Sequence, residues 1–115
     1  MDNPNYVPYT CYVAVTNEGQ IVGLGSLRHE LNDYLKQFGG HIGYSVVPNE
    51  RKKGYGTQIL KLLLKEAKNK NINNVLVTCE IHNVGSEKVI KNNKGELENK
   101  IEHDNKVTCR YWIKL

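Results

Sequence analysis

Residues 51–57 near the middle of the chain read RKKGYGT and combine positive charge with glycine, a pairing that suits phosphate binding. They follow an apolar run that ends at Pro48 and precede a long periodic segment. A glycine-bearing turn between a strand and a helix offers free backbone N–H groups and the positive end of the helix dipole to an anion. Glycines also let the backbone approach a ligand closely, and basic side chains add charge at the rim. The pattern therefore predicts a binding loop for a phosphate or pyrophosphate group.

The loop taken alone leaves a second interpretation open, an ordinary turn between a strand and a helix. The chain lacks the G-x-G-x-x-G spacing of dinucleotide sites and the G-x-x-x-x-G-K-[ST] spacing of P-loops. This argues against a dinucleotide or nucleoside triphosphate site. Thr57 could cap the following helix or donate its hydroxyl to the ligand.

The apolar pattern around the loop predicts a mixed α/β sheet in the order β-β-loop-β-α-β-α-β-β. Strands are expected at 9–16, 21–28, 41–47 and 75–81, the last of them central, with a hairpin at 96–103 and 107–115. Residues 30–38 fit either a short helix or an irregular loop. A helix is expected at 55–70 and a shorter one at 84–93, which Asn83 is placed to cap. The apolar stripe of the first helix consists of Ile59, Leu60, Leu63, Leu64 and Ala67.

Length and composition bound the class of protein. A chain of 115 residues has room for one core, so residues 1–115 are expected to form a single domain. With 39% hydrophobic residues, no bilayer-length apolar stretch and no signal-peptide pattern, the chain is expected to be cytoplasmic and to have no membrane partner. The net charge of +4 comes from scattered lysines, which a solvated helix face explains more simply than nucleic-acid binding.

The cysteines Cys11, Cys79 and Cys109 are the residues to consider for thiol or metal chemistry. Their odd number, wide spacing and lack of a C-x-x-C pair argue against a disulfide framework or a zinc site. No cluster of His, Cys, Asp and Glu has ligand spacing, so no metal is expected. All three cysteines lie in expected strands, and we expect small buried apolar side chains rather than a catalytic thiol.

Together with its flanks, the loop resembles the acyl-CoA pyrophosphate loop of the GNAT superfamily of N-acetyltransferases, which has the spacing Arg-x-x-Gly-x-Gly. The stretch from Gly39 to Gly95 looks like small bacterial members of that superfamily, through GGHIGYSVVPNERKKGYGT, VLVTCEIHN and NVGSEKVI. The segments KGELEN and RYWIKL extend the match to the end of the chain. The resemblance implies a mostly antiparallel central sheet flanked by helices. It also implies acetyl-CoA as co-substrate and direct attack by the amine of a small molecule or peptide.

The resemblance further implies which residues hold acetyl-CoA. The strand before the loop would pair with the pantetheine arm, and the backbone N–H groups from Lys52 to Thr57 would hold the pyrophosphate. Asn83 would reach the pantetheine as well as cap its helix, and Ser86 would face the cofactor unless it is a simple first-turn serine. The implied set is Val46, Val47, Arg51, Lys52, Lys53, Gly54, Tyr55, Gly56, Thr57, Asn83 and Ser86.

His41 is the candidate catalytic residue. Acetyl transfer needs an unprotonated amine, and family members often place a carboxylate near the position of His41 to take the proton. A histidine has a suitable pKa for that task. The alternative is a histidine at the start of a strand without a catalytic role.

Two departures from the family pattern matter. Many members carry a tyrosine on the last helix as general acid for the thiolate, where this chain has Val89 and Ile90. The chain also starts nearly at the family's second strand. We therefore expect a fragment, a shortened product or a subunit completed by another chain, and a homodimer would cover the apolar surface left open. The alternative function is a CoA-binding or regulatory module without acetyl transfer, whereas a nucleic-acid partner rests on charge alone and is not expected.

Overall fold

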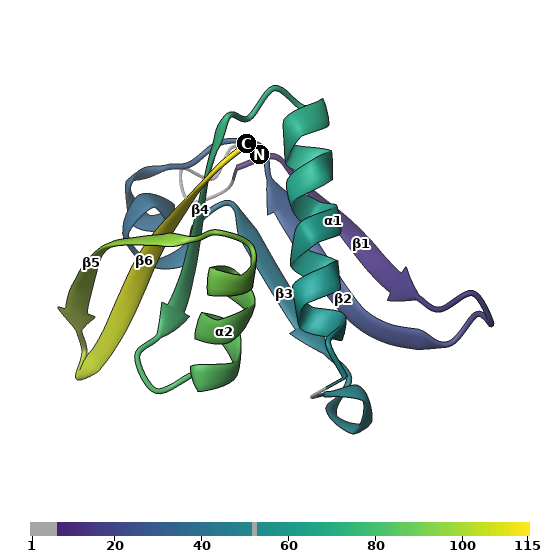
Figure 1. The fold of residues 1–115 in the computed structure, drawn as a ribbon. Coiled ribbons are helices and arrows are strands. Elements are labelled where there is room, and N and C mark those ends of the chain that lie inside the picture. The colour runs from purple at the N-terminus through teal and green to yellow at the C-terminus, as the bar shows by residue number, and fades with distance from the viewer. Residues whose placement is uncertain (1–6, 52) are drawn as a thin grey trace.

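The computed structural model describes residues 7–51 and 53–115, so the role predicted for Lys52 lies outside the described residues. No helix in these two ranges is long and apolar enough to span a membrane. A short π-helix, η1 (Leu35–Gly39), covers the end of the undecided segment 30–38 and extends one residue beyond it. A 3-10 helix, η2 (Pro48–Glu50), follows the third strand. The other elements have the predicted order (Figure 1): β1 (Tyr9–Val15), β2 (Ile21–Arg28), β3 (Ile42–Val46), α1 (Tyr55–Asn69), β4 (Asn74–Glu80), α2 (Val84–Asn92), β5 (Glu96–His103) and β6 (Lys106–Lys114).

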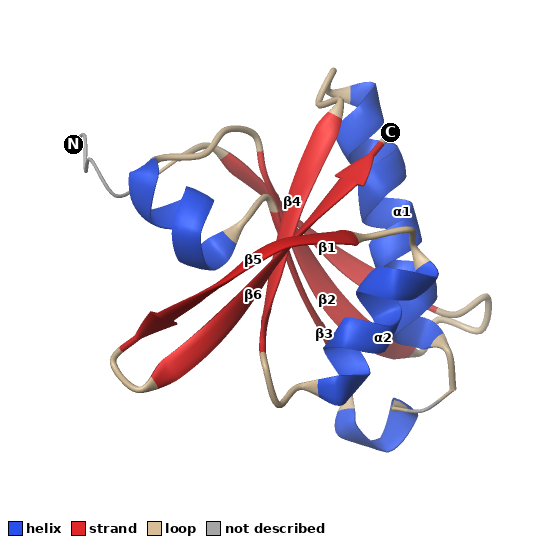
Figure 2. Ribbon diagram, turned by 60° about the vertical axis from the view of Figure 1, so that its left-hand side comes forward, coloured by secondary structure: helices blue, strands red, loops and turns tan. Residues whose placement is uncertain are grey.

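The described strands form two antiparallel sheets, in the orders β1-β2-β3 and β4-β6-β5. The helices α1 and α2 lie on one side of the strands and η1 lies on the other (Figure 2). This antiparallel, helix-flanked arrangement confirms the expected fold class. β4 was expected to be central, but β6 occupies the centre of the second sheet because both β4 and β5 pair with it.

Turn chemistry sets the register of both hairpins. Between β1 and β2, the N–H of Thr16 donates to the C=O of Gln20 at 2.9 Å and closes the loop. Between β5 and β6, Asp104 and Asn105 have φ values of 51° and 65°. A two-residue type I′ turn requires positive φ at both positions, and Asp and Asn tolerate it.

The apolar stripe of α1 packs on the sheet β1-β2-β3. All five residues of the predicted stripe are buried, which confirms the predicted helix face. The close approach depends on a glycine in β2, because a Cβ at Gly25 would lie 2.8 Å from Cδ1 of Leu63. The stripe therefore anchors α1, and with it the loop that precedes α1, to the first sheet.

The second sheet supplies the rest of the core through alternate residues of β4 and β6. Cys79 and Cys109 face each other across these strands and are buried, as predicted. The prediction is wrong for Cys11, which is exposed. Cys11 lies on β1, an edge strand whose alternate side chains face away from α1 and meet no covering element in the described part of the chain.

Candidate functional site

The two sheets meet at a single point, beyond which β3 and β4 diverge (Figure 1). Gly40 and Val77 form an isolated bridge. Next to it, the N–H of His41 donates to the C=O of Leu76 at 2.7 Å. From there β3 pairs only with β2 and β4 only with β6 among the described strands. One edge of β3 is therefore left without a strand partner, as a binding edge for an extended ligand requires.

The register of β3 shows which backbone groups lie on this open edge. The N–H of Val47 donates to Val22 and the C=O of His41 accepts from Arg28, both on β2. Because backbone groups alternate along a strand, those of Tyr44 and Val46 point away from β2 toward the open edge. The N–H of Val46 therefore lies on this edge, while its C=O accepts from Nε of Arg51 at 3.3 Å. Pairing of Val46 with a pantetheine arm stays a prediction. The same role for Val47 stays a prediction, because its C=O already accepts from Glu50 at 2.8 Å.

The start of α1 leaves backbone N–H groups free at the place where the sequence predicts an anion-binding loop. Gly54 is the N-cap residue with φ of 84°, and no side chain caps the helix. The first helical hydrogen bond runs from the N–H of Gln58 to the C=O of Gly54. The N–H groups of residues 55–57 precede it and are therefore available as donors at the positive end of the helix dipole.

Two basic side chains of the loop, those of Arg51 and Lys53, lie at its rim. Nε of Arg51 donates to the C=O of Val46 at 3.3 Å, so its guanidinium group lies at the end of β3. Nζ of Lys53 is 3.0 Å from the carboxylate of Glu50. Thr57 does not cap α1. Its hydroxyl instead accepts from Asn92 of α2 at 3.3 Å and so links the two helices.

The start of α2 closes the far side of the site. Oδ1 of Asn83 accepts from the N–H of Ser86 at 3.1 Å, which confirms the predicted cap. The hydroxyl of Ser86 lies 2.9 Å from the phenol oxygen of Tyr44, so the hydrogen bond crosses from α2 to β3. Burial raises the pKa of Tyr44, and its phenol is a neutral proton donor at physiological pH. Tyr44 was not among the predicted site residues; the signal was a tyrosine two residues before Val46 together with a serine in a capped first turn.

Asn83 offers a simple test of the cap. Replacing Asn83 with Ala should lower the free energy of unfolding by about 1 kcal/mol, because an amide of α2 loses its acceptor. Asn83→Asp keeps an acceptor and should retain most of the stability. Thermal unfolding of both variants is compared with Asn73→Ala, which removes an exposed asparagine side chain outside the helices. Equal losses for the Ala and Asp variants would contradict the cap.

His41 is buried at the point where the sheets meet. Its Nδ1 accepts from the N–H of Leu76 at 2.9 Å, and burial followed by the charge of Arg28 lowers its pKa. The neutral ring then carries its proton on Nε2 and has no free lone pair for a second proton. The catalytic role of His41 stays a prediction, and this hydrogen bond favours the structural alternative.

The elements that form the site are in close contact with one another. A Cβ at Gly56 would lie 3.0 Å from Cγ2 of Val89 and 3.7 Å from Cγ2 of Val46, so the start of α1, the end of β3 and α2 are already in contact. The two surface pockets described, of about 230 and 550 Å³, are lined by other residues. Among the described residues, no group of three or more His, Cys, Asp and Glu side chains could hold a metal ion.

Comparisons with known proteins agree with this geometry. The model of the acetyltransferase (GNAT) family matches residues 2–93, and no curated protein matches the chain. A putative phosphinothricin N-acetyltransferase has a TM-score of 0.73 and 19% identity over 91% of this chain and 70% of its own. A mutant of spermidine N-acetyltransferase from Vibrio cholerae has a TM-score of 0.77 and 13% identity, over 92% of this chain and 65% of its own. The aminoglycoside acetyltransferase AAC(6')-Ib with coenzyme A has a TM-score of 0.75 and 15% identity, over 92% of this chain and 66% of its own. The chain thus spans about two thirds of the length of these structures, whose likeness concerns the fold.

Proposed function

Because the chain belongs to the acetyltransferase (GNAT) family, we propose that it transfers the acetyl group of acetyl-CoA to an amine. The observation that carries the proposal is the open edge of β3 beside the uncapped, glycine-bearing start of α1. This pairing offers one surface to an extended arm and another to a pyrophosphate. The solved structures of AAC(6')-Ib with coenzyme A or acetyl-CoA support the choice of co-substrate.

The proposed binding mode follows the direction of β3. The pyrophosphate binds the N–H groups of residues 55–57, with Arg51 and Lys53 adding positive charge at the rim. The pantetheine arm runs back along β3 and bonds the N–H of Val46, whose C=O accepts from Arg51. Its thioester end then lies near Tyr44, about 7 Å further along the strand, beside Ser86 and Asn83.

The proposed reaction is a direct acyl transfer. The unprotonated amine attacks the thioester carbonyl, the C–S bond breaks, and the acetyl group ends on nitrogen. The amine gives up one proton and the CoA thiolate takes up one, so a donor near the sulfur assists the step. Tyr44 is the neutral donor that the geometry offers for this purpose. Small-molecule amines are the acceptor class we propose, supported by a neighbour solved with ribostamycin.

We also propose that the protein forms a homodimer through β1. The strand reads YTCYVAV, carries no charge and has one unpaired edge in the described structure. Val13 and Val15 of β1 and Leu24 of the neighbouring β2 are all more than half exposed. Uncharged apolar edge strands favour pairing with another strand. A monomeric mass in solution at high protein concentration would refute the dimer.

Calorimetry with acetyl-CoA tests the proposed site, and the chain offers a matched control. Gly54 and Gly19 have φ values of 84° and 85°, and a Cβ at either meets nothing within 4 Å. Alanine at either position strains a left-handed residue by about 1–2 kcal/mol. Only Gly54→Ala, however, disturbs the amides of the loop and should weaken acetyl-CoA binding about tenfold.

Two results would overturn the proposal: no binding by the unmodified chain at millimolar acetyl-CoA, or equal affinities of the two alanine variants. Release of CoA is then measured with a panel of amines. Tight binding without release from any amine would favour the alternative function, a CoA-binding module.

A further inference from the structure

A second candidate site lies at the opposite end of β4. A pocket of about 550 Å³, here called the Trp112 pocket, is lined by Asn74, Lys94, Glu96, Trp112 and Lys114. β4 begins in this pocket at Asn74 and ends at Glu80, close to Asn83. Seven strand residues span about 20 Å, so the pocket is separate from the proposed acetyl-CoA site. Its volume falls in the range of small-molecule sites.

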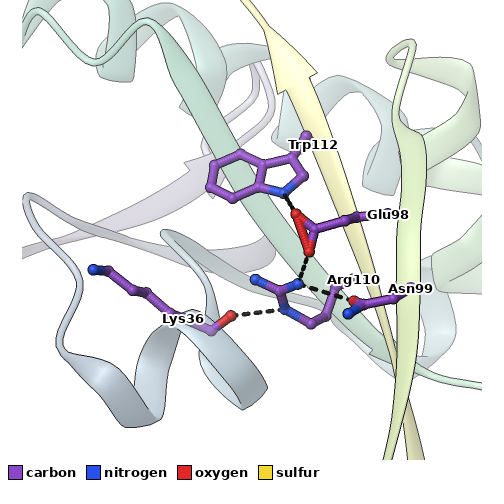
Figure 3. Close-up of polar contacts among 5 residues, drawn as sticks. All are labelled: Lys36, Glu98, Asn99, Arg110 and Trp112. Atoms are coloured by element: carbon purple, nitrogen blue, oxygen red, sulfur yellow. Dashed lines mark hydrogen bonds and ion pairs between the residues drawn. The ribbon is translucent and has the colours of Figure 1, made fainter.

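The indole of Trp112 is held in a fixed position at this pocket. Nε1 of Trp112 donates to Glu98 at 2.8 Å, and Arg110 bonds the same carboxylate (Figure 3). Glu98 is the extra residue of a β-bulge in β5, which turns its side chain over β6. Arg110 is nearly buried and also donates to the C=O of Lys36 at 2.7 Å and to Asn99 at 2.9 Å. The guanidinium group of Arg110 balances the negative charge of Glu98. The hydrogen bond from Nε1 to this carboxylate fixes the orientation of the indole ring before a ligand binds.

The rim of the pocket is positively charged. Lys94 and Lys114 form no ion pair within residues 7–51 and 53–115, and Glu96 is the only acidic residue in the lining. Lys94 is held by the turn after α2, where its φ is 67° and its N–H donates to Lys91 at 3.0 Å. Lysine stems can cover apolar surface while the ammonium groups stay at the rim.

A flat indole face beside two ammonium groups selects a particular ligand chemistry. An aromatic ring stacks on the indole, as nucleobases stack on aromatic side chains. An anionic substituent on that ring pairs with the lysines. A simple inorganic anion would leave the indole face unused. We propose that the Trp112 pocket binds a small planar aromatic anion, a ring that carries a carboxylate or a phosphate.

Tryptophan fluorescence monitors this site directly, because Trp112 is the one tryptophan of the chain. Titration with phenyl phosphate and with benzoate, followed by tryptophan fluorescence, should give saturable changes with at least one of them. The relative affinities identify the preferred anion. Inorganic phosphate and benzyl alcohol each keep one feature of the ligand and should bind at least about tenfold more weakly, since each lacks one interaction worth about 1.4 kcal/mol or more.

Variants assign the binding to the pocket. Lys114→Gln and Lys94→Gln should each weaken the binding of the preferred probe about fivefold or more. Lys61→Gln removes an exposed lysine of α1 and should leave the affinity unchanged. Trp112→Leu, followed by calorimetry, should abolish binding, with the melting temperature recorded to establish that the variant is folded.

Three results would overturn the proposal: fluorescence changes that never saturate, equal weakening by Lys61→Gln, or binding of inorganic phosphate as strong as that of the aromatic anions. The outcome is independent of the proposed function. Lys114→Gln should keep full acetyl-CoA affinity, and Gly54→Ala should keep full affinity for the aromatic probe.

Discussion

Tyr44→Phe is expected to lower the turnover of acetyl transfer about a hundredfold while changing acetyl-CoA affinity by less than about threefold. The variant keeps the half-buried ring and removes only the hydroxyl, which lies 2.9 Å from Ser86 beside the proposed thioester position. Without this donor the CoA thiolate leaves unprotonated, and that is the less favourable leaving group. The measurement is kcat from CoA release, with an amine that the unmodified chain acetylates.

The pH profile and two further variants separate catalysis from packing. Burial raises the pKa of Tyr44, so the phenol stays protonated to above pH 10 and the alkaline fall of kcat should lie there. In Tyr44→Phe this alkaline fall of kcat should be absent. Ser86→Ala should have a smaller effect than Tyr44→Phe, because it removes the partner and keeps the donor. Tyr12→Phe, a half-buried tyrosine of β1, should be neutral. A Tyr44→Phe enzyme with unchanged kcat would exclude Tyr44 as the donor.

The fold could be predicted because its local signals agree with one another. The five-residue stripe of α1 has helical spacing and is buried as a unit. Asp104 and Asn105 specify a two-residue turn, and the alternation along β6 specifies its buried face. The break between the sheets was expected only from the family resemblance and not from local patterns, because the divergence of β3 and β4 depends on contacts between distant segments. The single bridge joins Gly40 to Val77, which local periodicity cannot reveal.

Only those features of the candidate site that depend on neighbouring residues could be predicted from local patterns. Gly54, Gly56 and the cap at Asn83 follow from sequence patterns within a few residues. The contact of Tyr44 with Ser86 spans 42 residues, and that of His41 with Leu76 spans 35. The bulge at Glu98 shifts a side chain to the other face of its strand, which an uninterrupted period of two does not allow. Long-range contacts therefore decide which polar residues act together.

His41→Ala is expected to lower the free energy of unfolding by about 3 kcal/mol and the melting temperature by about 10 °C at neutral pH. The change leaves the buried N–H of Leu76 without an acceptor and removes a packed ring at the junction of the two sheets. His82→Ala, at an exposed histidine, is the matched control and should be neutral. The general-base hypothesis instead expects a loss of turnover of about ten- to a thousandfold with the protein still folded, so both stability and kcat are measured.

The pH dependence of stability tests whether His41 is neutral in the folded chain. The pKa of His41 in the folded chain is lowered below 6.5 by burial and by the nearby charge of Arg28. As the pH falls through 6.5, the unfolded chain therefore binds a proton before the folded chain does. The unfolded state binds more protons in that window, so stability falls with falling pH. His41→Asn keeps an acceptor for Leu76 and cannot titrate. Its melting temperature should therefore fall less between pH 7.5 and pH 5.5 than that of the unmodified chain. If the melting temperatures of the two proteins fell equally with pH, His41 would be charged as readily in the folded state as in the unfolded one. The interpretation of His41 as a buried neutral ring would then be wrong.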